Sequence, residues 1–297
     1  MTTILEKPGL WQLYTFSAFF WLGSIRMYGL LTDPCLLATG KSVCKEGAET
    51  FLSRSVAIGL FNIGTFYFIL AHMNKDDAPK LKRLANMSTM CVAALLASII
   101  FIGPSNHGGF ENSILHFMDL MSAFILLAIM LSAIGDGSNM AAPSFSLLEE
   151  QGINPKTFVS FLAAITFFKL VFMIDLEDPS LYLVDQGSVT AYSKVLWKFM
   201  IVILFMALFP IIFTLIYGNH KDQEAITGVT VIMMVVSTLS YIPIKDQLVN
   251  GVMSMAPVSS RITLLFAIIA IYNGRSNRPD DETKTVKHDT TEAIEVV

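Results

Sequence analysis

Five ionisable side chains stand inside long apolar stretches of the sequence: Arg26, His116, Asp119, Lys169 and Arg261. At the centre of a membrane helix, a charged side chain costs about 2.5–3.5 kcal/mol on insertion scales. Such groups therefore pair with one another, reach the membrane interface, or mark a path for an ion or solute. The sequence spacing indicates that all five lie in the outer half of the membrane.

Asp119 is too short to reach the membrane interface, so we expect it to pair with Arg261, Lys169 or Arg26. The excess of cations over this one carboxylate favours a small anionic solute, and a proton is the alternative. His116 shares a helix face with Asp119 and could titrate near neutral pH. Two other interpretations stay open: the long cations reach the interface by themselves, or the ion pair only locks two parts of the protein together.

The composition indicates which elements must position these groups. Hydrophobic residues make up 54% of the 297 residues and charged residues 15%, whereas soluble domains average about 25% charged residues. The charges fall between apolar runs of about 20 residues, the length that crosses the hydrocarbon core of a bilayer. The sequence therefore predicts an all-α integral membrane protein with about eight transmembrane helices, near residues 10–31, 53–73, 84–103, 114–134, 157–174, 195–217, 226–243 and 255–272.

A repeated pattern divides these helices into two similar four-helix halves. Arg26 precedes Asp33-Pro34 after the first run, as Lys169 precedes Asp178-Pro179 after the fifth. The polar turns at 75–78 and 221–225 are also alike. Because four helices return the chain to the side it started from, the halves would form a parallel repeat. The expected organisation is a first repeat at 1–139, a cytosolic linker at 140–156, a second repeat at 157–274 and a disordered polar tail at 275–297.

The Lys and Arg residues of the loops collect on the side that holds both termini, which places the N- and C-termini in the cytosol. The first outer loop then faces an oxidising compartment. Its two cysteines, Cys35 and Cys44, are predicted to form a disulfide.

Transport or conduction of a small ion or anionic solute, at the interface of the two halves, is the leading functional hypothesis. One alternative is a non-catalytic structural or assembly subunit of a membrane complex, and an oligomer or complex partner stays open. The other is a membrane enzyme, for which His116 and Asp119 offer an acid and a base without a nucleophile or metal constellation. We assign no catalytic residue, metal ligand or cofactor. Besides lipid, the expected partner is the small solute or a proton; nucleic acid is excluded because the sequence has no basic block to follow phosphates.

Overall fold

The computed structural model describes residues 9–29, 48–102, 113–132, 153–175, 191–242 and 262–274. Within these ranges every regular element is a helix and there is no strand, which confirms the all-α prediction. Each predicted apolar run overlaps one helix. The helices are α1 (Leu10–Tyr28), α3 (Ala48–Met73), α4 (Ala78–Ile102), α5 (Ser113–Leu131), α6 (Pro155–Asp175), α7 (Ala191–Tyr217), α8 (His220–Tyr241) and a last helix, Ile262–Gly274.

Among the described residues, three helical segments are long and apolar enough to cross a membrane: Glu49–Met73, Ala78–Phe101 and Ser193–Tyr217. They belong to α3, α4 and α7. The segments Leu120–Leu131 and Ile262–Gly274 are apolar but shorter. Length and hydropathy of these helices are therefore consistent with a helical membrane protein.

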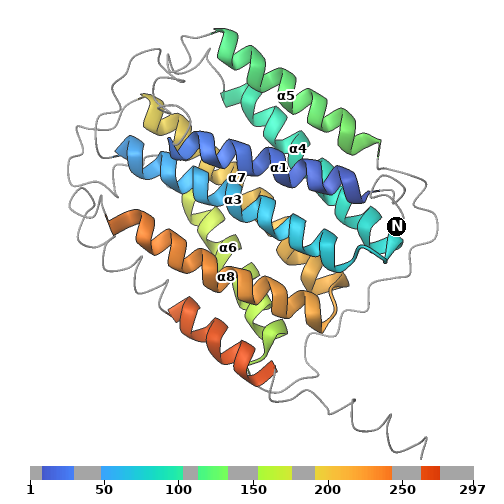
Figure 1. Cartoon of the computed structure of the whole chain (residues 1–297). Coiled ribbons are helices and arrows are strands. Elements are labelled where there is room, and N and C mark those ends of the chain that lie inside the picture. Colours follow the sequence, from blue (N-terminus) through green and yellow to red (C-terminus); the bar gives the residue numbers. More distant parts are fainter. Residues whose placement is uncertain are drawn as a thin grey trace, which may run out of the picture.

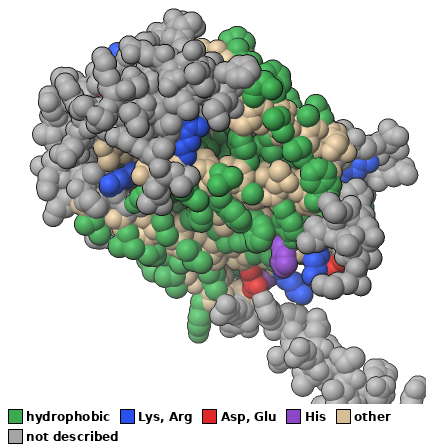
Figure 2. All heavy atoms as spheres, turned by 45° about the horizontal axis from the view of Figure 1, so that its top comes forward, with side chains coloured by type: hydrophobic (Ala, Val, Ile, Leu, Met, Phe, Trp, Pro, Cys, Tyr) green, Lys and Arg blue, Asp and Glu red, His purple; other side chains and the backbone are tan. Residues whose placement is uncertain are grey.

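The surface of the bundle carries many large hydrophobic side chains. Phe101 of α4 is 75% exposed, Phe168 of α6 67% and Leu265 of the last helix 58%. Figure 2 shows a broad area of hydrophobic side chains on one face, with charged and histidine side chains at its margins. A water-soluble monomer rarely exposes so much contiguous apolar surface, so lipid is the solvent that suits this face.

The central helices of the bundle are α3 and α7, which pack against each other. Helix α1 lies along α3, and α6 lies along α7. The central helices also contact helices of the other part of the chain: α4 packs on α7, and α8 packs on α3. Figure 1 shows α5 and the last helix at opposite edges of the bundle.

Several helix termini gather at one end of the bundle, because the helices alternate in direction. Tyr14 near the start of α1 hydrogen-bonds His72 near the end of α3, with 3.2 Å between Oη and Nδ1. At the same end Gln12 Nε2 donates to Ser132 Oγ just beyond α5. We call this the turn end, because the short α3–α4 and α7–α8 connections lie here.

Glycine allows close approach at two levels of α3. A Cβ at Gly59 would overlap the Ile203 side chain of α7. A Cβ at Gly64 would lie 2.9 Å from the Ser17 carbonyl oxygen of α1. Beside it, Trp21 Nε1 donates to Thr65 Oγ1 at 3.1 Å. Small residues thus bring α3 against both of its main partners, as membrane helices commonly do.

Candidate functional site

Two of the predicted charged residues, Arg26 and Lys169, differ in how far they are exposed. Arg26 is half-buried near the C-terminal end of α1, which stops at Gly29 with φ 85°. Lys169 is exposed on α6, next to the exposed Phe167 and Phe168. Lys169 therefore faces away from the interior of the bundle.

The other predicted residues are only partly covered by the structure. His116 and Asp119 belong to α5, but their side chains lie outside the described part. Arg261, Cys35 and Cys44 also lie outside the described residues. The expected Asp119–Arg261 pair falls on these residues and stays a prediction. We therefore build the site from other residues.

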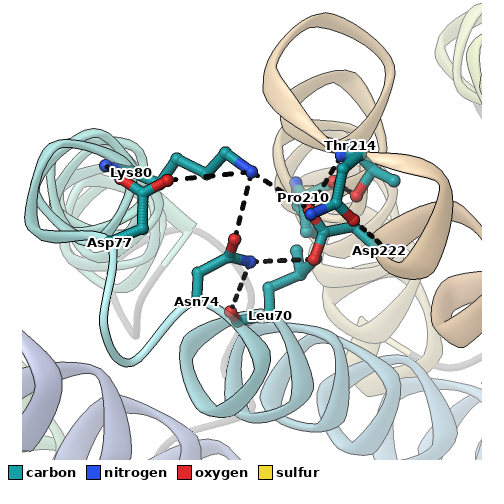
Figure 3. Close-up of polar contacts among 8 residues, drawn as sticks. Leu70, Asn74, Asp77, Lys80, Pro210, Thr214 and Asp222 are labelled. Carbon is teal, nitrogen blue, oxygen red and sulfur yellow. Dashed lines mark hydrogen bonds and ion pairs between the residues drawn. The ribbon is translucent and has the colours of Figure 1, made fainter. Parts of the chain in front are cut away.

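A buried polar network joins the two halves of the chain at the turn end (Figure 3). Asn74, just after α3, donates from Nδ2 to Asp222 Oδ1 of α8 at 2.9 Å. Lys80 of α4 donates from Nζ to Asn74 Oδ1 at 3.2 Å and lies 3.5 Å from Asp222 Oδ2. Asn74 and Lys80 come from the first half of the chain and Asp222 from the second, so these contacts cross the interface between them.

Asp222 is satisfied on all sides although its side chain is only 1% exposed. Besides Asn74 and Lys80, its Oδ2 accepts from the backbone N–H of Asn219 at 2.9 Å. A buried carboxylate needs such donors, because transfer of an unpaired charge from water into the protein is strongly unfavourable. The network is therefore a specific structure rather than a chance surface pair.

Local helix capping positions both charges of this network. Asp77 Oδ1 accepts from the Lys80 backbone N–H at 3.0 Å at the start of α4. Asn219 Oδ1 accepts from the Asp222 backbone N–H at 2.9 Å at the start of α8, and the Asp222 side chain completes a capping box. Lys80 and Asp222 thus occupy the same position in the first turns of α4 and α8, three residues after the capping side chain.

A second polar cluster lies deeper in the same interface, where α3, α4 and α7 meet. Pro210 interrupts the hydrogen-bond ladder of α7, because proline has no N–H to donate to the Met206 carbonyl. The Cys91 thiol of α4 donates to that carbonyl at 3.7 Å, and Tyr67 Oη of α3 lies 3.3 Å from Cys91 Sγ. Tyr67 and Cys91 are fully buried, so the cluster replaces the missing helical bond with contacts between helices.

A row of buried side chains connects the two clusters along α4. Leu84 and Ser88 lie between Lys80 and Cys91 at helical spacing and are fully buried. On the α7 side, Thr214 is also fully buried and donates to the Pro210 carbonyl at 2.8 Å (Figure 3). The buried face of α4 therefore connects the two polar clusters from the turn end to the middle of the helix. We call this set, from Lys80 to Cys91 with the residues facing it, the interface row.

The sequence pattern does not predict either of the two polar clusters. The likeness of the turns at 75–78 and 221–225 is visible in the sequence, but hydropathy assigns their charges to loops. A signal is present in Asn219 followed by Asp222, which is the pattern of a capping box and places Asp222 inside a helix. Pro210 in an apolar run is a second signal, because the carbonyl that it leaves free needs a partner.

The described residues contain no group of three or more His, Cys, Asp or Glu side chains able to hold a metal ion. Comparison with protein-family models, with curated proteins and with solved structures finds no match for this chain. The geometry of the interface is therefore the basis for assigning a function.

Proposed function

We propose that the chain is a polytopic membrane protein that moves a small ion or a small anionic solute along the interface of two four-helix halves. The observation that carries this proposal is the interface row, which places buried polar groups of both halves between the turn end and the middle of the bundle. The preference for an anion is carried over from the sequence alone, in which Arg26, Lys169 and Arg261 outnumber the one embedded carboxylate; the structure places Lys169 on an exposed face of α6.

Three features support the division into two similar halves. First, α4 packs on α7 while α8 packs on α3, as expected if an axis exchanges α3 with α7 and α4 with α8. Second, α5 and the last helix occupy opposite edges (Figure 1). Third, Gln12 near the start of α1 bonds Ser132 after α5, and Ile153 before α6 accepts from Asn273 of the last helix; both bonds span 120 residues.

The proline break in α7 supports transport more directly than the symmetry does. Transporters often bind their cargo near the bilayer midplane, where interrupted helices present backbone groups without helical partners. The Met206 carbonyl is such a group, and its donor is a thiol, which is a weak hydrogen-bond donor. A passing cation or water molecule can replace that donor at little cost.

The proposal is tested with the purified full chain in sealed liposomes. Fluxes of protons, chloride and a small carboxylate are measured under imposed gradients, with protein-free liposomes as the baseline. Ser88→Trp puts a bulky side chain into the interface row, and Met90→Trp is the matched control because Met90 is 58% exposed on the same helix. We expect flux in the wild type and in Met90→Trp, and a loss of flux in Ser88→Trp.

Size-exclusion chromatography establishes that each variant is folded. If Ser88→Trp does not fold, Ser88→Val replaces it in the flux measurement. Absence of flux for all three solutes, with the protein inserted in both orientations, would contradict transport of a small ion or anion. Equal flux in the Ser88 and Met90 variants would place the path elsewhere.

A structural role is the second candidate, and the contact between Gly59 and Ile203 favours it. Close packing of α3 on α7 at this level would hold the halves rigidly. In that case the polar clusters would act as locks, no flux would be seen, and thiol reagents would reach Cys91 only after unfolding.

A further inference from the structure

We propose that Asn74, Lys80 and Asp222 form a gate that closes the interface at the turn end and opens when the two halves separate there. This inference rests on the proposed function and adds a regulated opening to it. In the predicted topology the gate faces the cytosol.

The network fits a gate because each charge has a second partner on its own half. Lys80 Nζ lies 3.9 Å from Asp77 Oδ2, which belongs to the same turn and is 42% exposed. Asp222 keeps the Asn219 backbone N–H and the positive N-terminal end of α8. Separation of the halves therefore leaves neither charge isolated.

In an ion pair that holds the two halves together permanently, each charge would have its partners only on the other half. When two buried charges depend only on each other, removal of one partner leaves the other uncompensated, at a typical cost of about 3–5 kcal/mol. Here the contacts that cross the interface are those from Asp222 to Lys80 and Asn74, and each of these residues also has a contact within its own half. This division of partners lowers the free-energy cost of separating the halves at the turn end.

The gate covers the end of the interface row. Behind it lie Leu84, Ser88 and then Cys91, all fully buried. Cys91 is thus a native reporter: it is shielded while the gate is closed and becomes reachable from the turn end when the gate opens.

The test measures which side of the membrane reaches Cys91. The chain has three cysteines, so Cys35→Ser with Cys44→Ser leaves Cys91 as the single thiol. This protein is placed in sealed liposomes of defined orientation. A small, charged, membrane-impermeant methanethiosulfonate reagent is added to one side, and the rate of Cys91 modification is measured by mass spectrometry.

Lys80→Gln and Asp222→Asn each remove one charge of the gate while a polar side chain of similar size remains. Lys75→Gln is the matched control, because it removes an exposed charge next to Asn74 that makes neither of the contacts across the interface. We expect both gate variants to be labelled about tenfold faster from the turn end, the change produced by about 1.4 kcal/mol in an opening equilibrium. Labelling from the opposite side, and labelling of Lys75→Gln, should equal that of the parent protein.

Unchanged labelling in both folded gate variants would overturn the gate. Faster labelling from both sides would also overturn it, because that result means general loosening of the bundle. If Asp222→Asn fails to fold, the labelling of Lys80→Gln alone tests the gate, since Lys80 does not take part in the α8 capping box. The labelling of Cys91 needs no substrate, so the two proposals can fail separately. If flux is seen but the gate variants are labelled at the parent rate, only the gate is rejected. If the gate variants are labelled faster from the turn end but no flux is seen, only transport of the tested solutes is rejected.

Discussion

Lys80 Nζ and Asp222 Oδ2 lie 3.5 Å apart, and these two residues hold the same position in the first turns of α4 and α8. The first turn of α4 supplies the basic side chain, and the first turn of α8 supplies the acidic one. Equivalent positions of two helix N-termini therefore meet as a complementary pair between the first and second halves of the chain. Opposite charges at these positions favour association of the two halves of the chain.

Mutation of this pair should show energetic coupling. We expect Lys80→Gln and Asp222→Asn each to lower the midpoint of thermal unfolding in detergent, and the double variant to lose less than the sum. The coupling should be about 0.5–3 kcal/mol, the range typical of residues in direct contact. Asp77→Asn should couple to Lys80 more weakly, because that contact is longer and more exposed. Strict additivity for Lys80 and Asp222 would contradict the structure.

Packing at glycine gives a second prediction. Gly59→Ala should destabilise the protein, because the new methyl group would overlap the Ile203 side chain. Ile203→Ala should recover part of that loss by making room. Gly228→Ala in α8 is the control: a Cβ added there would meet nothing within 4 Å, and alanine favours a helix over glycine by about 1 kcal/mol. Thermal unfolding in detergent separates these cases, and a neutral Gly59→Ala would show that α3 and α7 are not tightly packed.

The positions of the helices can be read from the sequence, but their starts cannot. Apolar runs of membrane length identify every helix of the described residues, because hydropathy dominates the signal. The predicted runs at 84–103 and 226–243 begin too late, since α4 starts at Ala78 and α8 at His220. The Asp77 and Asn219 caps extend these helices into polar sequence, so hydropathy alone assigns Lys80 and Asp222 to loops.

The partners of the embedded charges cannot be read from the sequence either. Hydropathy gives the depth of Lys169 but not the side of α6 on which it lies, and α6 has apolar residues all round. The structure shows Lys169 exposed beside Phe168. The Cys91–Met206 contact joins residues 115 positions apart, and only tertiary packing determines such a pair.

Topology gives a third prediction, which concerns residues outside the described part of the structure. With both termini cytosolic and an even number of crossings, cysteines introduced at Thr291 and Glu111 on a cysteine-free background should be labelled from opposite sides. Labelling of both from one side would contradict eight spans. In the native protein, Cys35 and Cys44 should resist alkylation without a reducing agent, because they are predicted to form a disulfide.

The contact between Cys91 and the Pro210 break gives the last prediction. Cys91→Ala leaves Tyr67 Oη without its thiol partner and the Met206 carbonyl without its donor. An unsatisfied buried polar group costs about 1–3 kcal/mol, so Cys91→Ala should lower the unfolding midpoint clearly. Pro210→Ala restores a backbone N–H in α7 that can donate to the Met206 carbonyl. The penalty of Cys91→Ala should therefore be smaller in the Pro210→Ala background than in the wild type.

Two controls isolate this effect. Cys91→Ser keeps a donor at the same place and should cost less than Cys91→Ala. Tyr67→Phe removes the hydroxyl but not the donor to Met206, so its cost should not depend on Pro210. If Cys91→Ala costs the same with and without Pro210, the thiol does not serve the freed carbonyl. The transport proposal would then lose its weakly held backbone acceptor in the middle of the interface.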